Sequence, residues 1–280
     1  EMLNYTEEDR KKDRISGENL IQLAISEINK EDNFLNKIYR GVEKSEDRIE
    51  ILKKIQELER KGIFDKDVED DPEAPVLMPE DINYLSNSLR QKLRTKYAFK
   101  IAGWFVNFLI RQKKLIIKEI VGSENFEKIS GGAVMTCNHF NAFDSFAMQL
   151  AFDESKQKKK KMYRVIREGN YTGFPGFYGF LMRNCNTLPL SSNFKTMEKF
   201  IRAVDKVLNK GDFVLIYPEQ SMWWNYRKPK PLKKGAFTFA AKNNVPIIPC
   251  FITMEDSDVI DGDGFFIQEY TIHIGEPIFP

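Results

Sequence analysis

Short apolar runs alternate with helix-like segments from about residue 119 onward, and this alternation constrains the fold more than any other feature. Apolar runs that predict buried strands lie at 133–137, 163–166, 213–217, 245–253 and 270–274. Segments that predict helices lie between them, at 145–152, 197–208 and 235–243. Strands that alternate with helices predict an α/β domain with a largely parallel sheet flanked by helices.

The first part of the chain has a different composition. Residues 1–62 carry apolar stripes at helical spacing, which predicts an α-helical N-terminal region. Residues 63–79 contain three prolines and many acids, which is typical of a linker. Residues 80–118 predict a further helical segment, so the α/β domain is expected to span residues 119–280.

The charge and the cysteine content exclude several classes of protein. Lys and Arg number 43 against 41 Asp and Glu, so the near-neutral chain does not resemble a nucleic-acid binder. Three cysteines do not suggest a disulfide framework and are expected to be reduced thiols. No Cys or His pair has the spacing of zinc ligands, so we expect no metal site.

A segment rich in aromatic residues, 97–110, predicts contact with a membrane surface. It is too short to span a bilayer and is interrupted by Lys100, so it is expected either to lie in the membrane interface or to pack in the core. The first alternative predicts that Trp104, Phe105 and Phe108 contribute to an exposed apolar patch. The polar N-terminus resembles no secretory signal, so we expect a peripheral location on the cytoplasmic face of a membrane that carries anionic lipid.

A histidine and an aspartate follow the first strand of the domain. His139 comes just after residues 133–137, where open α/β sheets place their ligands, and Asp144 stands five residues later at the start of the next helix. A carboxylate bonded to one ring nitrogen orients an imidazole and leaves the other nitrogen free to act as a base. Spacing alone favours the other interpretation, in which Asp144 is a simple helix cap and His139 is a structural loop histidine.

Several motifs follow one another in a characteristic order. Asn138, His139 and Asp144 fit the pattern NHxxxxD. Four further segments approximate a second aromatic region, the motif FPEGTRS, a KxGA segment and a final Val-Pro strand, at residues 174–179, 217–222, 232–237 and 245–249. With these motifs the chain resembles the glycerolipid acyltransferase family, the group that contains 1-acylglycerol-3-phosphate acyltransferases, over about residues 119–280.

The resemblance implies an O-acyltransferase of phospholipid biosynthesis. His139 would be the general base, oriented by Asp144, and a lysolipid hydroxyl would attack the thioester of acyl-CoA or of an acyl carrier protein. Both thioesters are co-substrates, so no cofactor is expected. Backbone N–H groups near Gly235, or in the loop after Glu219, are candidates for the oxyanion site. The residues predicted to bind substrate are Asn138, Glu219, Gln220, Ser221, Arg227, Lys233, Lys234 and Gly235.

Two departures from the family pattern concern the acceptor. The arginine that normally ends the second region is replaced by residues 191–193, and the Gly-Thr-Arg of the third motif by Gln220, Ser221 and Met222. In the family those arginines are thought to hold the acceptor's phosphate. Two alternatives therefore accompany the main prediction: an acyltransferase that acts on a non-phosphorylated acceptor such as a glycolipid, and a catalytically silent lipid-binding homologue.

Overall fold

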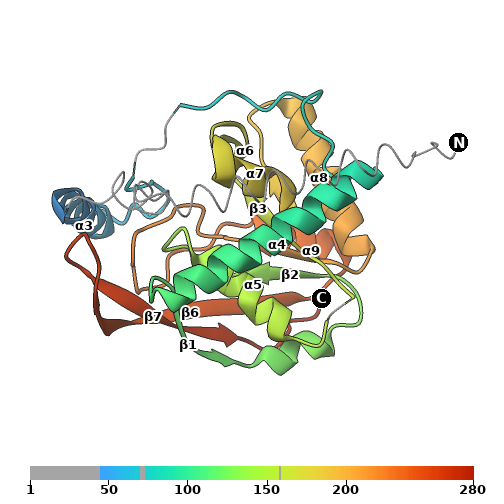
Figure 1. Cartoon of the computed structure of the whole chain (residues 1–280). Coiled ribbons are helices and arrows are strands. Elements are labelled where there is room, and N and C mark those ends of the chain that lie inside the picture. The colour runs from blue at the N-terminus through green and yellow to red at the C-terminus, as the bar shows by residue number, and fades with distance from the viewer. Residues whose placement is uncertain (1–44, 70–72, 158) are drawn as a thin grey trace, which may run out of the picture.

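One seven-stranded sheet forms the centre of the protein (Figure 1). The computed structural model describes residues 45–69, 73–157 and 159–280, so the helices predicted within residues 1–44 lie outside the described residues. The strands are β1 (Ile116–Val121), β2 (Ala133–Thr136), β3 (Met162–Ile166), β4 (Thr187–Pro189), β5 (Phe213–Ile216), β6 (Ile247–Ile260) and β7 (Phe266–Ile274). They lie side by side in the order β1-β7-β6-β2-β5-β3-β4.

The sheet is largely parallel, as the alternation of strands and helices predicted. Five neighbouring strands run in one direction, from β6 through β2, β5 and β3 to β4. Only β7 and its neighbour β1 run the other way, because β6 and β7 form an antiparallel hairpin. The turn of this hairpin is at residues 261–265, which contain two Asp-Gly pairs, a combination typical of hairpin turns. The predicted α/β fold class is confirmed.

Helices cover both faces of the sheet (Figure 1). On one face, α4 (Leu89–Arg111), α5 (Asp144–Glu154) and the short 3-10 helix η1 (Ser123–Lys128) enclose the larger apolar core. On the other face, α8 (Phe194–Asn209) and α9 (Gly235–Asn243) enclose a second core. Two short helices, α6 (Glu168–Thr172) and α7 (Gly176–Asn184), follow β3. The chain thus enters α5 directly after the loop that carries His139.

Helix α4 shows why residues 97–110 are so apolar. Ala98, Ile101, Phe105 and Leu109 recur at helical spacing and are buried against the domain. The predicted exposed patch is therefore wrong for Phe105, which is 1% exposed, while Trp104 on the outer side is 41% exposed. In the described part of the chain, no helix is both long and apolar enough to span a membrane.

Some boundaries differ from those predicted. Strand β1 begins inside residues 80–118, which were expected to be helical, and residues 80–88 form turns before α4. A strand of β-branched residues, Ile116–Val121, was overlooked because its exposed positions carry charges. The short strand β4 was not predicted either, because three residues are too few to produce a periodic pattern.

The described residues of the segment expected to be a linker are attached to the domain. It follows α3 (Ser45–Arg60), which ends just before Gly62. Its backbone carbonyl at Lys66 accepts a hydrogen bond from the Trp223 indole at 2.7 Å. Further along, Leu77 is 1% exposed and its backbone N–H donates to Glu168 at 2.7 Å. Side chains distant in sequence satisfy this irregular backbone, so the described residues of 63–79 are packed against the domain.

Candidate active site

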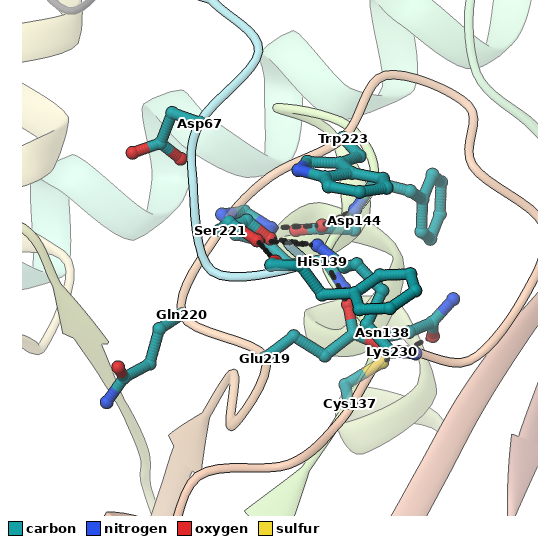
Figure 2. Close-up of polar contacts among 12 residues, drawn as sticks. Asp67, Cys137, Asn138, His139, Asp144, Glu219, Gln220, Ser221, Trp223 and Lys230 are labelled. Carbon is teal, nitrogen blue, oxygen red and sulfur yellow. Dashed lines mark hydrogen bonds and ion pairs between the residues drawn. The ribbon is translucent and has the colours of Figure 1, made fainter. Parts of the chain in front are cut away.

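His139 and Asp144 meet in a tight loop at the end of β2. The ring nitrogen Nδ1 of His139 lies 2.6 Å from Oδ2 of Asp144, the contact that their spacing predicted (Figure 2). The carboxylate also accepts the backbone N–H of Phe140, at 3.2 Å. Asn141 shapes the loop by accepting the N–H of Phe143 at 3.0 Å. The fold therefore turns the carboxylate back onto the imidazole as soon as the helix begins.

The two members of the pair differ in their exposure to solvent. The Asp144 side chain is 1% exposed, whereas that of His139 is 27% exposed. With Nδ1 donating its proton to the carboxylate, the other nitrogen, Nε2, carries the lone pair. Nε2 has no hydrogen-bond partner among the residues that the structure describes. A base of this kind needs a free nitrogen that a substrate hydroxyl can reach, and this arrangement provides one.

The loop after β5 is joined to the loop that carries His139. Because β2 and β5 are neighbouring parallel strands, both loops leave the sheet at the same edge. Glu219 accepts the backbone N–H of His139 at 3.2 Å, and the N–H of Trp223 donates to the carbonyl of His139 at 3.3 Å. The aromatic ring of Tyr217 stacks against the imidazole, with ring centroids 4.3 Å apart. The third motif thus fixes both the backbone and the ring of His139.

Glu219 is a structural brace in this arrangement. It is 3% exposed, and its other oxygen accepts the backbone N–H of Lys230 at 3.2 Å. The Lys230 ammonium lies 3.4 Å from the same carboxylate and donates to the hydroxyl of Ser221 at 2.9 Å. Burial lowers the pKa of Lys230, and the charge of Glu219 opposes that shift. The predicted role of Glu219 in binding substrate does not fit a carboxylate that is occupied by the protein itself.

Other predicted binding residues are also occupied by the protein. The amide of Asn138 is buried, donating to the carbonyl of Ile252 at 3.0 Å and accepting its N–H at 2.8 Å. Ser221 is 0% exposed and donates to the carbonyl of Phe64 at 2.6 Å. Figure 2 shows the side chain of Gln220 pointing away from His139. Asn138 and Ser221 therefore hold loops together. Contact of these three residues with substrate stays a prediction.

The positively charged residues that were predicted to bind substrate are distributed over the rim of the domain. Arg227 donates to Asp256 and Gln268 on the β6–β7 hairpin. Lys233 forms an ion pair of 2.9 Å with Asp65. Lys234 and Gly235 are exposed at the start of α9. Among the described residues, none of these side chains is bonded to His139.

Three functional candidates were missed from the sequence. Arg167 follows β3 directly and donates to both carboxylate oxygens of Asp67, each at 2.6 Å. Glu168 accepts the hydroxyls of Ser191 and Ser192 at 2.6 and 3.0 Å, at the position where the family pattern has an arginine. Lys230 is the third. A charged residue just after a predicted strand, as at Arg167, was the signal that was available.

Cys137 does not have the properties of a nucleophile. Its thiol is 2% exposed and donates to the amide oxygen of Asn138 at 3.4 Å. Burial raises the pKa of this thiol well above its usual value, and the nearby Cys250 and Asp144 raise it further. A thiolate is the reactive form, so a Cys137–His139 nucleophilic pair is disfavoured. Among the described residues, no group of three His, Cys, Asp or Glu side chains is arranged to hold a metal ion.

A cavity of about 260 Å³ lies between α4, α5 and α7. Its walls are mainly apolar and include Ala102, Phe146, Leu150 and Leu181. The first turn of α5 contributes Ser145 and Phe146, next to Asp144. His139 itself is not among the residues that line this cavity.

The polar end of the cavity is closed by bonded side chains. Arg164 donates to the carbonyl of Cys185 at 2.9 Å and to the amide oxygen of Gln149. Gln149 in turn donates to Asp153 at 2.8 Å. Burial lowers the pKa of Arg164 and raises that of Asp153. The cavity is therefore an apolar space with a charged end.

Comparison with known proteins identifies the domain. Residues 118–253 match the model of the Acyltransferase family. Among curated proteins, none matches the chain significantly. A solved structure with similarity is that of the 1-acyl-sn-glycerophosphate (LPA) acyltransferase PlsC from Thermotoga maritima. It has 19% identity and a TM-score of 0.42, over 70% of this chain and 75% of the other.

A TM-score of this size supports no conclusion about fold or function, so identification depends on the family model. That model covers the strand before His139, the His139–Asp144 pair and the loop after β5. The family predicted from the motifs is confirmed by this match. Through residues 118–253 the chain belongs to the acyltransferase family and is an acyltransferase.

Proposed function

We propose that this enzyme moves a fatty acyl group from a thioester donor to the hydroxyl of a lysolipid. The observation that carries the proposal is the 2.6 Å contact between Nδ1 of His139 and the buried carboxylate of Asp144, within a domain of the acyltransferase family. A histidine with one nitrogen fixed and the other free is suited to remove a proton from an alcohol. The pair therefore supplies the base that acyl transfer to a hydroxyl requires.

The proposed reaction needs no covalent acyl-enzyme. Nε2 of His139 takes the proton as the hydroxyl oxygen attacks the thioester carbonyl carbon. The new C–O bond forms, the carbonyl oxygen becomes an oxyanion, and collapse breaks the C–S bond. The departing thiolate receives the proton from the imidazolium, while the negative charge of Asp144 stabilises the imidazolium between these steps. The buried Cys137 thiol plays no part in this scheme.

An oxyanion site remains a prediction. In the loop after Glu219, the N–H groups of Gln220, Trp223 and Asn225 are already bonded to backbone carbonyls. Helix α9 begins at Gly235, and the N–H groups of its first turn have no carbonyl partner within the helix. This leaves the start of α9 as the better of the two candidates named from the sequence.

Transfer activity is tested directly with labelled donors. Purified enzyme is incubated with radiolabelled acyl-CoA, or acyl carrier protein, and a panel of lysolipids. Wild type should form labelled diacyl product, and His139→Ala should lose at least about a hundredfold in kcat, the scale of general-base catalysis. Equal rates for wild type and His139→Ala, with matching circular dichroism spectra, would contradict the proposal.

The non-phosphorylated acceptor is a second candidate, favoured by one observation. Cations near the site are already paired: Arg167 with Asp67, Lys228 with Glu59 and Lys233 with Asp65. Where the family pattern has an arginine, Ser192 instead donates to Glu168. A phosphate would have to displace these carboxylates. A side-by-side kcat/KM for lysophosphatidate and for an uncharged lysoglycolipid tests it, and a clear preference for lysophosphatidate would count against it.

We also propose that the acyl chain of the donor lies in the cavity between α4, α5 and α7. The apolar walls suit a hydrocarbon chain, and Ser145 and Phe146 bring the cavity next to Asp144. The enzyme would work as a peripheral protein on the cytoplasmic face of a membrane with anionic lipid. Support for membrane contact comes from Trp104 and Ile110, exposed on α4 beside Lys100 and Arg111.

A further inference from the structure

Tyr217 occupies the position that is phenylalanine in the family's third motif. It directly follows β5, and its ring stacks on the imidazole of His139 at 4.3 Å with an interplanar angle of 22°. A phenylalanine would make the same stacking contact. The chain therefore adds only a hydroxyl at this position, and what that hydroxyl contacts decides whether it has a role.

Two buried oxygen atoms at this site lack a full hydrogen bond. Asp144 uses Oδ2 for the ring of His139 and for the backbone N–H of Phe140. Its other oxygen, Oδ1, has no partner among the described residues, and neither has the hydroxyl of Tyr217. A buried polar group without a partner is costly and uncommon in folded proteins. One oxygen that accepts and one hydroxyl that can donate are complementary.

The two groups are close enough to influence each other. Burial raises the pKa of the Tyr217 phenol well above its usual value, and Asp144 raises it further through its charge and a hydrogen-bond contribution. The phenol is therefore protonated and can donate, although the contact does not reach full hydrogen-bond geometry.

Other ionisable groups surround this pair. Cys137 after β2 and Arg164 on β3 also influence the pKa of Tyr217, in opposite directions. Tyr270 on β7 is influenced by Asp144, and Glu219 accepts the backbone N–H of His139. None of these residues has a hydrogen bond to Oδ1 of Asp144 in the described structure. Asp144 acts on Tyr270 through its charge alone, but on Tyr217 through a hydrogen-bond contribution as well, so Tyr217 is the hydroxyl better placed to complete this carboxylate.

We propose that Tyr217 is a positioning residue, whose hydroxyl donates to Oδ1 of Asp144 and so holds the carboxylate in line with Nδ1 of His139. The inference rests on the proposed role of His139 as base. A carboxylate held at both oxygens keeps the imidazole in one tautomer and one orientation while a proton moves to Nε2 and off again. The stacked ring limits rotation of the imidazole from its other side.

The test is Tyr217→Phe, which removes the hydroxyl and keeps the ring. We expect kcat to fall by about tenfold to a hundredfold, the scale of one lost hydrogen bond to a charged group, with KM for the acyl donor unchanged. A carboxylate without this donor holds the imidazolium proton more tightly. The acidic limb of the profile of kcat/KM against pH should therefore move to higher pH.

A spectroscopic readout is independent of catalysis. The chain has two histidines, so the imidazole region of a nitrogen-15 NMR spectrum is simple to assign. The Nδ1 proton of His139 should shift in Tyr217→Phe and stay unchanged in Tyr163→Phe. Tyr163 is a partly buried tyrosine of the other core and serves as the matched control.

Two outcomes would overturn the inference. One is a Tyr217→Phe enzyme that equals wild type in kcat, in pH profile and in the NMR signal of His139. The other is an equal loss of kcat on adding Tyr217→Phe to an Asp144→Asn enzyme, because the hydroxyl would then act elsewhere. Failure of the proposed function is distinct: it appears as full activity in His139→Ala. Circular dichroism checks that each variant folds.

Discussion

At the position where the family's third motif has glycine, this chain has a glutamine in a left-handed backbone conformation. Gln220 has a φ of +64°, in the left-handed region, at the position where FPEGTRS has glycine. A residue with a Cβ pays a cost of roughly 1–2 kcal/mol in this conformation, whereas glycine does not. The side chain of Gln220 points away from His139. Nothing in the structure explains why this position has glutamine instead of glycine.

Replacing Gln220 by glycine should stabilise the protein. We expect Gln220→Gly to increase the free energy of unfolding by about 1 kcal/mol, and thus to raise Tm by roughly 2–4 °C. Gln220→Ala keeps the Cβ and serves as the control that should give no such gain. Thermal unfolding followed by circular dichroism measures both. A decrease in Tm for Gln220→Gly would mean that the glutamine side chain makes a stabilising contact that outweighs the strain.

The residues of a motif do not all have the same role at the site. The spacing of His139 and Asp144 allowed either a catalytic pair or a helix cap, and their 2.6 Å contact supports the first. The motif also suggested substrate contacts for Asn138 and Ser221, yet both side chains are bonded to backbone groups. Motif letters identify which residues are gathered at a site. They do not separate residues that face the substrate from residues that build the loops.

At the scale of elements, one carboxylate holds the end of the acidic segment before α4, near Leu77. Glu168, at the start of α6, accepts the N–H of Leu77 and the hydroxyls of Ser191 and Ser192. Burial tends to raise the pKa of this glutamate. The hydrogen bonds from Ser191, Leu77 and Ser192 outweigh burial, so the pKa lies below its usual 4.5.

This shift predicts a dependence of stability on pH. A carboxyl whose pKa is lower when folded stabilises the protein above about 4.5, and that contribution is lost as the pH falls through the folded-state pKa. At pH 7, Glu168→Gln should lower Tm by roughly 2–4 °C, the scale of one weakened charged hydrogen bond. The difference from wild type should shrink below pH 4.5. Glu198→Gln, at an exposed position of α8, is the control. A difference in Tm between Glu168→Gln and wild type that is independent of pH would contradict this account.

Helix α4 faces three different environments: the core, the cavity and the solvent. Phe105 and Leu109 face the core, Ala102 and Val106 line the cavity, and Trp104 is exposed. The sequence left two alternatives open for this segment, a membrane-facing helix and a core helix. The structure gives a core helix with an outer apolar edge.

The proposed membrane contact makes α4 a target for mutation. Trp104→Glu should reduce flotation with vesicles that contain anionic lipid, because it removes apolar area and adds a negative charge. Phe194→Glu changes a phenylalanine that is 77% exposed on α8, over the opposite face of the sheet, and should leave flotation unchanged. Equal flotation of wild type and Trp104→Glu would remove the support for contact through α4.

At the scale of the whole molecule, the cavity exists only because α4, α5 and α7 meet over the sheet. Ala102→Trp should fill part of it. If an acyl chain lies there, excluding about four methylenes at roughly 0.8 kcal/mol each lowers kcat/KM for long-chain donors on the order of a hundredfold. Butyryl donors should be little affected. Ala241→Trp, exposed on α9, is the control. An equal loss for short and long donors would show that the cavity does not hold the chain.

The sequence by itself determined the class of the fold and the catalytic candidates. Strand and helix periods are local properties, so the alternation after residue 119 predicted the sheet and most of its helices. His139 and Asp144 are five residues apart, and one turn of chain suffices to bring them together. The pairing of β1 with β7 and the short strand β4 left no comparable local signal.

Only the tertiary structure decided which residues meet across long separations. Arg167 reaches Asp67, Trp223 reaches Lys66, and Tyr217 lies on His139, each pair more than seventy residues apart. Such contacts depend on the order of strands and on which loops leave the same edge of the sheet. The segment with prolines and acids looked like a linker because composition reports local stiffness and charge. Whether distant side chains bind its backbone is a property of the complete fold.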